Sequence, residues 1–238
     1  MTGIIIQARM NSTRLPGKVL MPVGKRLLLE HIMFRLGHLL INAKVVIATT
    51  TSKIDDTIEG FCKTRKVDCF RGDEHNVLER YYLCAKEHGF KDIVRLTGDN
   101  PFPDIDEMKR LISLHKDNLN DYTECFTVLP IGAGMEVFTF AALKRSYEMA
   151  TKPHHFEHVN EFMLEHMDVF KCETLGVPDA KSKPKFRLTV DTREDYEHAC
   201  FIATNAATEY VTTYEAIRLS EQYRLKNERT GGANDGRN

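Results

Sequence analysis

Four short apolar segments, each followed by a helical pattern, constrain most strongly what this chain can fold into. The apolar segments are residues 4–6, 44–51, 67–70 and 92–96. Apolar residues then recur at helical spacing over residues 26–40, 52–65, 74–88 and 103–116. Strands that alternate with helices in this way form right-handed βαβ units. The first half of the chain therefore predicts a mostly parallel sheet covered by helices on both faces.

The second half has a different pattern. Residues 121–140 read as extended segments interrupted by Pro130, Gly132 and Gly134. Further helices are predicted over residues 139–149, 154–167 and from Thr192 onward, and further strands over residues 169–175 and 186–190. We expect one three-layer α/β domain over residues 1–226, with residues 121–140 as an extended excursion and residues 227–238 as a disordered tail.

Bulk properties exclude several classes of protein. The formal net charge is −1 at pH 7, so affinity for phosphate must be local and no global field favours nucleic acid or an anionic membrane. No apolar run is long enough to cross a bilayer, and the N-terminus lacks the layout of a secretory signal. The six cysteines include no Cys-x-x-Cys pair, which argues against a zinc site or a disulfide scaffold. We expect a cytoplasmic protein that binds neither nucleic acid nor membranes.

The segment after the first apolar run is rich in groups that bind phosphate. It contains Arg9, Arg14 and Lys18, together with the hydroxyls of Ser12 and Thr13. Ligands of open α/β sheets bind beyond the carboxyl ends of the strands. Guanidinium groups match phosphate oxygens bidentately, and lysine supplies a compact charge. This basic loop predicts a nucleoside triphosphate site at the tip of the first strand, with a solvated basic loop as the plainer alternative.

Two familiar phosphate-binding loops do not fit this segment. A P-loop needs glycine where the chain has Ser12, and a hydroxyl residue where Val19 follows Lys18. A dinucleotide-binding loop has three spaced glycines, whereas this segment carries cations.

Two aspartates follow apolar runs and are candidate metal ligands. Asp99 comes just after the fourth apolar segment, and Asp191 follows residues 186–190. Mg²⁺ prefers one or two carboxylates together with phosphate oxygens and water. Either aspartate alone would be an ordinary turn or cap residue. If both strands lie near the first, the two carboxylates face the cations of the basic loop, and the pair predicts a Mg²⁺ site.

Residues 5–20 read Ile-Ile-Gln-Ala-Arg-Met-Asn-Ser-Thr-Arg-Leu-Pro-Gly-Lys-Val-Leu. This segment closely resembles the start of the SpsF-like cytidylyltransferases of spore-coat polysaccharide biosynthesis, and more distantly the acylneuraminate and 3-deoxy-manno-octulosonate cytidylyltransferases. Residues 70–82, 95–101 and 188–195 resemble later motifs of the family. The resemblance implies the nucleotide-diphospho-sugar transferase fold, which is glycosyltransferase-A-like, with CTP and a sugar-acid-like acceptor as substrates and Mg²⁺ as cofactor.

The resemblance also implies site residues. Asp99 and Asp191 would hold the metal, while Arg14 and Lys18 would stabilise the leaving pyrophosphate, helped by backbone amides near Ala8 and Arg9. The expected nucleotide-binding residues are Gln7, Ala8, Arg9, Ser12, Arg14, Lys18, Thr50, Arg71, Asp73 and Arg80. Glu136 and His158 lie in segments that resemble acceptor-facing elements of the family.

Some features leave alternatives open. Gly134 stands where many relatives have Asp, so the family's usual acceptor is not implied. His154, His155 and His158 have a spacing that metal ligands on a helix can have, but no fourth ligand accompanies them.

Rival functions are a glycosyltransferase, which would need an Asp-x-Asp motif after the fourth strand, and a non-catalytic nucleotide-binding relative. The nearest candidate motif, Asp104 to Asp106, falls at a predicted helix start. Dimers are common in the resembling families, and residues 121–140 are the expected interface of a homodimer.

Overall fold

A seven-stranded sheet forms the centre of the computed structural model, which describes residues 1–231 and the side chains up to residue 228. Its strands are β1 (Thr2–Gln7), β4 (Ala43–Thr50), β5 (Asp68–Gly72), β6 (Asp92–Thr97), β7 (Tyr122–Glu124), β8 (Glu136–Thr139) and β9 (Cys172–Thr174). The spatial order is β5-β4-β1-β6-β8-β7-β9. Strands β5, β4, β1 and β6 run parallel, β8 is antiparallel to both of its neighbours, and β9 runs parallel to β7. The prediction of a mostly parallel sheet is confirmed.

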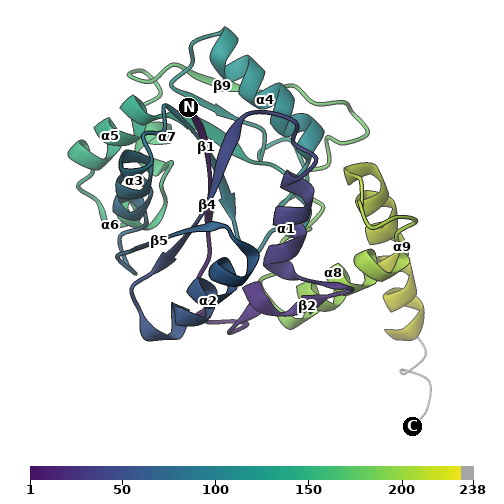
Figure 1. The fold of residues 1–238 in the computed structure, drawn as a ribbon. Coiled ribbons are helices and arrows are strands. Elements are labelled where there is room, and N and C mark those ends of the chain that lie inside the picture. Colours follow the sequence, from purple (N-terminus) through teal and green to yellow (C-terminus); the bar gives the residue numbers. More distant parts are fainter. Residues whose placement is uncertain (232–238) are drawn as a thin grey trace.

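Helices cover both faces of this sheet, which confirms the predicted three layers (Figure 1). The α-helices are α1 (Leu28–Leu36), α2 (Asp56–Arg65), α3 (Val77–Glu87), α4 (Ile105–Asp117), α5 (Phe140–Met149), α6 (Pro153–Glu157), α7 (Glu161–Glu165), α8 (Arg193–Asn205) and α9 (Thr213–Gly231). Two 3-10 turns, η1 (Lys18–Leu20) and η2 (Lys53–Asp55), and a small hairpin of β2 (Pro22–Val23) and β3 (Arg26–Leu27) complete the described elements.

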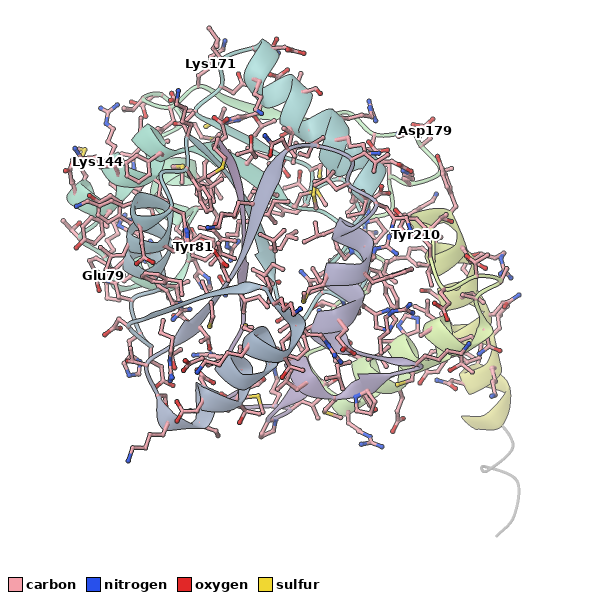
Figure 2. All side chains as sticks on the ribbon, viewed as in Figure 1. Glu79, Tyr81, Lys144, Lys171, Asp179 and Tyr210 are labelled. Carbon is pink, nitrogen blue, oxygen red and sulfur yellow. The ribbon has the colours of Figure 1, made fainter. Side chains whose placement is uncertain are left out.

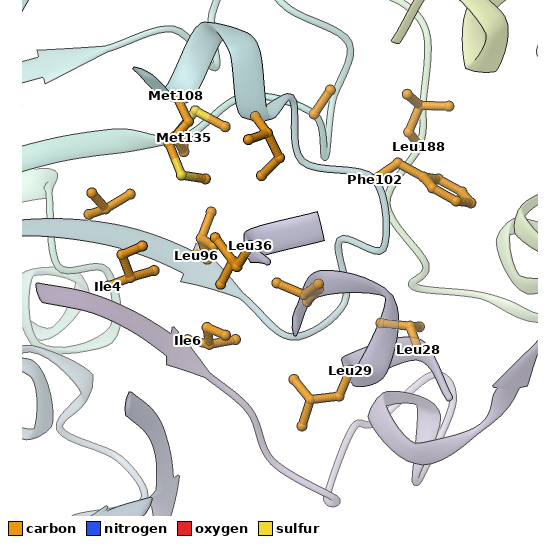
Figure 3. Packing of buried hydrophobic residues seen from close by; sticks show 14 of the residues in the cluster. Ile4, Ile6, Leu28, Leu29, Leu36, Leu96, Phe102, Met108, Met135 and Leu188 are labelled. Atoms are coloured by element: carbon orange, nitrogen blue, oxygen red, sulfur yellow. The ribbon is translucent and has the colours of Figure 1, made fainter. Parts of the chain in front are cut away.

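The first strand lies between two parallel neighbours, so its alternating side chains are buried on both faces. Ile4 and Ile6 point into the core shared with α1, α4 and α8, whereas Ile5 points into the core shared with α3 and α5. None of the three is more than 1% exposed. Each such side chain contributes roughly 1.5–3 kcal/mol through the hydrophobic effect, and Figure 3 shows Ile4 and Ile6 among their neighbours. This burial fixes the tip of β1, and therefore the start of the basic loop.

A tyrosine ties the other helical layer to the sheet. Tyr81 lies on the inner side of α3, and Glu79 lies on the outer side (Figure 2). The Tyr81 hydroxyl lies 3.1 Å from the carbonyl oxygen of Leu96 and 3.3 Å from that of Ile5. A buried hydroxyl needs such partners, so α3 is held over the junction of β1 and β6.

Both ends of the segment 121–140 lie within the sheet, and residues 125–135 connect them. Strands β7 and β8 come from this segment, and each has a strand on both sides. Tyr122 and Phe138 are at most 1% exposed. The sequence pattern predicted an excursion from the domain at this segment. An extended pattern shows that a segment can form strands, but it does not show which strands they pair with.

Other boundaries also differ from expectation. Residues 26–27 form β3, so the first helix begins only at Leu28. Residues 186–190 form no strand of the sheet and make a single bridge, between Arg187 and Ile131. Helix α9 continues to Gly231, which is inside the segment expected to be disordered. The rest of that segment, residues 232–238, lies outside the described residues.

Two glycines allow the chain to approach itself closely beside β8. Gly132 has a φ of 92°, and a Cβ there would lie 2.6 Å from the backbone nitrogen of Thr189. A Cβ on Gly134 would lie 2.3 Å from the Cα of Phe126 and 2.8 Å from the carbonyl oxygen of Cys125. An aspartate at position 134 would therefore collide with this backbone.

We predict that Gly134→Ala destabilises the fold, because the added methyl group overlaps backbone that cannot move freely. The expected loss is about 1–3 kcal/mol of unfolding free energy, as for other overpacked sites. Gly60→Ala is the matched control, since its Cβ would have open space in α2 and alanine favours a helix by roughly 1 kcal/mol. Urea denaturation midpoints measure both, and equal midpoints for the two variants would contradict the prediction.

Candidate functional site

A cleft of about 590 Å³ opens beyond the carboxyl ends of β1 and β6. Most of the residues predicted from the sequence line it: Gln7, Ala8, Arg9, Ser12, Arg14, Lys18, Arg80, Asp99, His158 and Asp191. They come from the basic loop, from the start of α3, from the tip of β6, from the end of α6 and from the segment before α8. The structure therefore brings these distant segments together at one edge of the sheet.

Backbone hydrogen bonds bring the two candidate metal ligands together. The amide of Gly98 donates to the carbonyl of Gln7 at 2.7 Å, which joins the tips of β6 and β1. The amide of Val190 donates to the carbonyl of Asp99 at 2.9 Å. Asp191 is therefore placed beside Asp99 by the hydrogen bond between its neighbour Val190 and the Asp99 carbonyl. This bond forms although residues 186–190 are not a strand of the sheet.

Lys18 joins the two carboxylates directly. Its ammonium Nζ lies 3.0 Å from Oδ2 of Asp99 and 2.8 Å from Oδ1 of Asp191. Lys18 is only 7% exposed, so these contacts are shielded from solvent. The hydroxyl of Thr97 donates to the other oxygen of Asp99 at 2.6 Å and orients that carboxylate.

Asp191 also faces two guanidinium groups. One nitrogen of Arg187 lies 2.5 Å from Oδ2 of Asp191, and one of Arg14 lies 3.4 Å from Oδ1. Burial raises the pKa of the Asp191 carboxyl, but the hydrogen bond from Lys18 and the surrounding cations outweigh it, so this pKa lies below its ordinary value. The carboxylate is therefore held in its charged form.

Asp195 supports Asp191 from the first turn of α8. Its carboxylate accepts hydrogen bonds from the backbone amides of Asp191 at 3.0 Å and Thr192 at 2.9 Å, and pairs with Arg187 at 2.8 Å. Burial opposes ionisation, but Arg187 and the amides lower the pKa of Asp195 to about 2. Thr192 and Asp195 form a capping box at the start of α8, and the Asp195 carboxylate also fixes the backbone of Asp191.

The donor set suits a hard divalent cation. Asp99 and Asp191 present carboxylate oxygens close enough for one ammonium to contact both. Oxygen ligands of this kind, completed by phosphate oxygens and water, are those that Mg²⁺ prefers.

Asp55 is a buried acid that the sequence pattern did not single out. It is 1% exposed, and its carboxylate accepts from the backbone amide of Met10 at 2.7 Å and from the hydroxyl of Thr50. It therefore anchors the start of the basic loop to the end of β4. From the sequence alone, Asp55 looks like an ordinary acidic residue at the start of a helix.

Four predicted site residues do not line the cleft. Thr50 is buried and bound to Asp55, so it does not approach the nucleotide site. Arg71 pairs with Asp56 and Glu59 at 2.7 Å each, on the α2 side of β5. The Asp73 carboxylate caps its own turn by accepting from the amides at 75 and 76. The fourth residue, Glu136, is described next.

Glu136 is buried in the sheet and is not at the acceptor side of the cleft. It pairs with Arg95 at 2.7 Å, and it accepts hydrogen bonds from the Tyr122 hydroxyl and, at 3.0 Å, from the Asn160 amide. Only 1% of the residue is exposed. Glu136 therefore lies where it cannot contact an acceptor in the cleft, and that prediction is wrong. This glutamate instead joins the sheet to the start of α7.

Other polar groups line the cleft without having been predicted. Glu74, His75 and Glu157 are among them. The buried Oε1 of Gln7 and Nε of Arg80 have no hydrogen-bond partner within the described part of the chain. Buried polar atoms without partners are uncommon, and both residues line the cleft. By contrast, the amide of Ala8, expected to orient phosphate, already donates to the carbonyl of Ala48 at 3.1 Å.

The histidines after Lys152 do not form a helical metal site. Helix α6 ends at Glu157, so His158 lies beyond it in extended backbone. His154 and His155 instead contact Glu165, at 2.6 Å and 3.2 Å, and the ammonium of Lys152 also contacts Glu165. The ligand atoms of His154, His155 and Glu165 lie within 4.8 Å of one another.

The Asp-x-Asp candidate lies away from the cleft. Asp104 caps α4, is 3% exposed, and contacts Lys181 at 2.9 Å and the Thr213 hydroxyl at 2.6 Å. Its carboxylate is therefore used in joining α4 to α9, which argues against a glycosyltransferase metal motif at this position.

Known proteins are similar to this chain over most of its length. Residues 3–223 match the protein family described as Cytidylyltransferase. The spore coat polysaccharide biosynthesis protein SpsF of Bacillus subtilis is 38% identical over 198 residues, which cover 81% of this chain and 82% of that protein.

No helix within residues 1–231 is both long and apolar enough to span a membrane.

Solved structures show the same fold. A cytidylyltransferase from Leptospira borgpetersenii has a TM-score of 0.86 and 32% identity, covering 94% of this chain and 95% of that chain. A CMP:2-keto-3-deoxy-manno-octonic acid synthetase, solved as a complex with CTP, has a TM-score of 0.65 and 15% identity, covering 85% of this chain and 98% of that chain. The second likeness concerns the fold alone.

We expect Glu136→Gln to lower stability without changing the cleft, because it leaves Arg95 buried without its charged partner. The loss should be about 3–5 kcal/mol of unfolding free energy. Glu148→Gln is the control, since Glu148 forms only an exposed pair on α5 and should change stability by less than about 0.5 kcal/mol. Urea denaturation measures the stability, and nucleotide titration of the folded variant checks the cleft; weakened nucleotide binding at unchanged stability would restore a role in the site.

Asp195 should contribute to the acid sensitivity of the protein. Its pKa of about 2 lies below the ordinary 3.8, so its stabilisation, about 2 kcal/mol, is present above pH ~4 and is lost as the pH falls towards 2. Asp195→Asn should therefore be less stable than the wild type at pH 7, with the difference shrinking by pH 2.5. Denaturation midpoints across this range test it, with the exposed Glu197→Gln on the same helix as control. A pH-independent difference would contradict this assignment.

Proposed function

The chain belongs to the cytidylyltransferase family, and we propose that it transfers CMP from CTP to a hydroxyl group of a sugar acid or a related acceptor, with release of pyrophosphate. The product would serve in the biosynthesis of a surface polysaccharide or glycoconjugate. The observation that carries the proposal is the contact of Lys18 with both Asp99 and Asp191 at the mouth of the basic loop.

The cations of the basic loop account for the nucleotide half of the reaction. Arg9 and Arg14 are exposed in the cleft, where they meet a triphosphate without first breaking buried ion pairs. Charge builds on the leaving pyrophosphate as the bond to the α-phosphorus breaks, and Arg14 and Lys18 stabilise that charge. The Asp55 carboxylate holds the backbone of this loop by accepting from the Met10 amide.

Asp99 and Asp191 account for the metal half. Mg²⁺ bound to them would neutralise phosphate charge and lower the pKa of the acceptor hydroxyl. The chain keeps both carboxylates oriented: Thr97 binds one and Arg187 the other. Such positioning supplies much of the rate enhancement in phosphoryl-group transfer.

The remaining walls of the cleft suggest where the rest of each substrate lies. Glu74, His75 and Arg80 line the side next to α3, and we assign this side to cytosine and ribose. Glu157 and His158 line the side next to α6, and we assign that side to the acceptor. The unpartnered Nε of Arg80 and Oε1 of Gln7 supply one donor and one acceptor for the nucleotide.

Pyrophosphate release tests the reaction. The purified protein is incubated with Mg²⁺, each of the four nucleoside triphosphates and a panel of sugar acids, and pyrophosphate is measured. We expect release that requires both CTP and one class of acceptor. Transfer of sugar from a nucleotide sugar without pyrophosphate release would favour a glycosyltransferase instead, and absence of turnover with intact CTP binding would favour a nucleotide-binding relative.

Asp99→Asn should lower kcat by at least about 10²–10³-fold, because it removes a charge on which the transition state depends, while CTP binding persists in part. Asp106→Asn is the matched control: Asp106 is exposed at the start of α4 and belongs to the alternative Asp-x-Asp motif. Steady-state kinetics with pyrophosphate detection separate the two. Full activity of Asp99→Asn, or loss of activity in Asp106→Asn, would contradict this placement of the metal.

A further inference from the structure

We propose that Lys18 is an internal cation that competes with the divalent metal for Asp99 and Asp191, so that the metal binds tightly only when a nucleoside triphosphate is present. The inference rests on the proposed function, since it concerns the same two carboxylates. It adds an order of binding to that function and assigns Lys18 a second task besides contacting phosphate.

The position of the ammonium group is the first argument. Lys18 Nζ contacts one oxygen of Asp99 at 3.0 Å and one of Asp191 at 2.8 Å. The second oxygen of each carboxylate already has another partner, Thr97 on Asp99 and Arg187 on Asp191. A cation shared between the two carboxylates would therefore use the oxygens that this ammonium contacts. Lys18 is 7% exposed, so little solvent separates the charges, and an ammonium and a divalent ion at the same place repel each other strongly.

The charge count is the second argument. Three cations face this group: Lys18, Arg14 and Arg187. Three carboxylates are in contact with them, on Asp99, Asp191 and Asp195. The group is therefore balanced without a metal, and a divalent ion alone would add positive charge that no carboxylate within the group offsets. A triphosphate brings several negative charges, which attract both the metal and the ammonium of Lys18.

The third argument is that Lys18 can change partner while the site keeps its shape. Lysine carries its charge on a flexible four-carbon stem, and the backbone of Lys18 is fixed in η1 by the bond from Met21 to its carbonyl at 3.0 Å. Thr97 still orients Asp99, and Arg187 still orients Asp191, after the ammonium has turned towards phosphate. Release of Lys18 therefore exposes two carboxylates that are already in position.

Mn²⁺ binding to the nucleotide-free protein tests the proposal, with free Mn²⁺ measured by electron paramagnetic resonance. Lys18→Met removes the charge and keeps the length of the side chain, and it should bind Mn²⁺ at least tenfold more tightly than the wild type. Lys18→Arg keeps the charge and should bind Mn²⁺ as weakly as the wild type. Thermal melting of each variant confirms that it is folded.

Two comparisons show whether the bridging position matters, as opposed to charge in general. Arg14→Gln removes one charge from the same cleft, but Arg14 contacts only Asp191, at 3.4 Å. It should change the Mn²⁺ affinity less than threefold. The α,β-methylene analogue of CTP should strengthen Mn²⁺ binding at least tenfold in the wild type, and less in Lys18→Met.

The outcomes separate this inference from the function on which it rests. Equal Mn²⁺ affinity of the nucleotide-free wild type and Lys18→Met would overturn the competition. In that case, loss of Mn²⁺ binding by Asp99→Asn in the complex with the CTP analogue would still support the metal site of the proposed function. If Asp99→Asn and Asp191→Asn both leave Mn²⁺ binding to that complex unchanged, the metal site itself is wrong, and the competition is overturned with it.

Discussion

The contact of one ammonium group with two carboxylates unites three segments that are far apart in the chain. Lys18 comes from the loop after β1, Asp99 from the tip of β6, and Asp191 from the segment before α8. Shielded contacts between opposite charges are strong only when both partners are held in place. Most other features of the site can be understood as the means by which these three positions are fixed.

Each position is fixed by a different kind of interaction. The loop is held by burial of β1 on both faces and by the bond from Met10 to the buried carboxylate of Asp55. Asp99 is held by the register of β6 beside β1. Asp191 depends on the amide of Val190 and on the capping carboxylate of Asp195. The guanidinium groups of Arg9 and Arg14 are exposed in the cleft, where a ligand that arrives from solvent can reach them.

Some charged residues near the site line the cleft, and others form ion pairs that hold the fold together. Arg14 lies in the loop that follows β1, and Arg71 lies near the end of β5, both in the parallel half of the sheet. Arg14 is exposed in the cleft, whereas Arg71 is paired with two acids of α2. Glu136 likewise forms an ion pair with Arg95 inside the sheet. Sequence position alone does not distinguish these fates, because ion pairs form between residues that only folding brings together.

The sequence by itself determined the parallel half of the sheet and the layers of helices, because apolar periodicity and the order of strands follow directly from local patterns. It also determined that a cluster of cations follows the first strand. It did not determine that residues 122–124 and 136–139 pair inside the sheet, that residues 186–190 attach to distant segments by three backbone hydrogen bonds, or that Asp55 anchors the loop. These features depend on pairing between distant segments, and hydrogen-bond partners are chosen by the geometry of the folded chain. Only the tertiary structure placed the ammonium of Lys18 between Asp99 and Asp191, since that position requires all three segments to be in register at once.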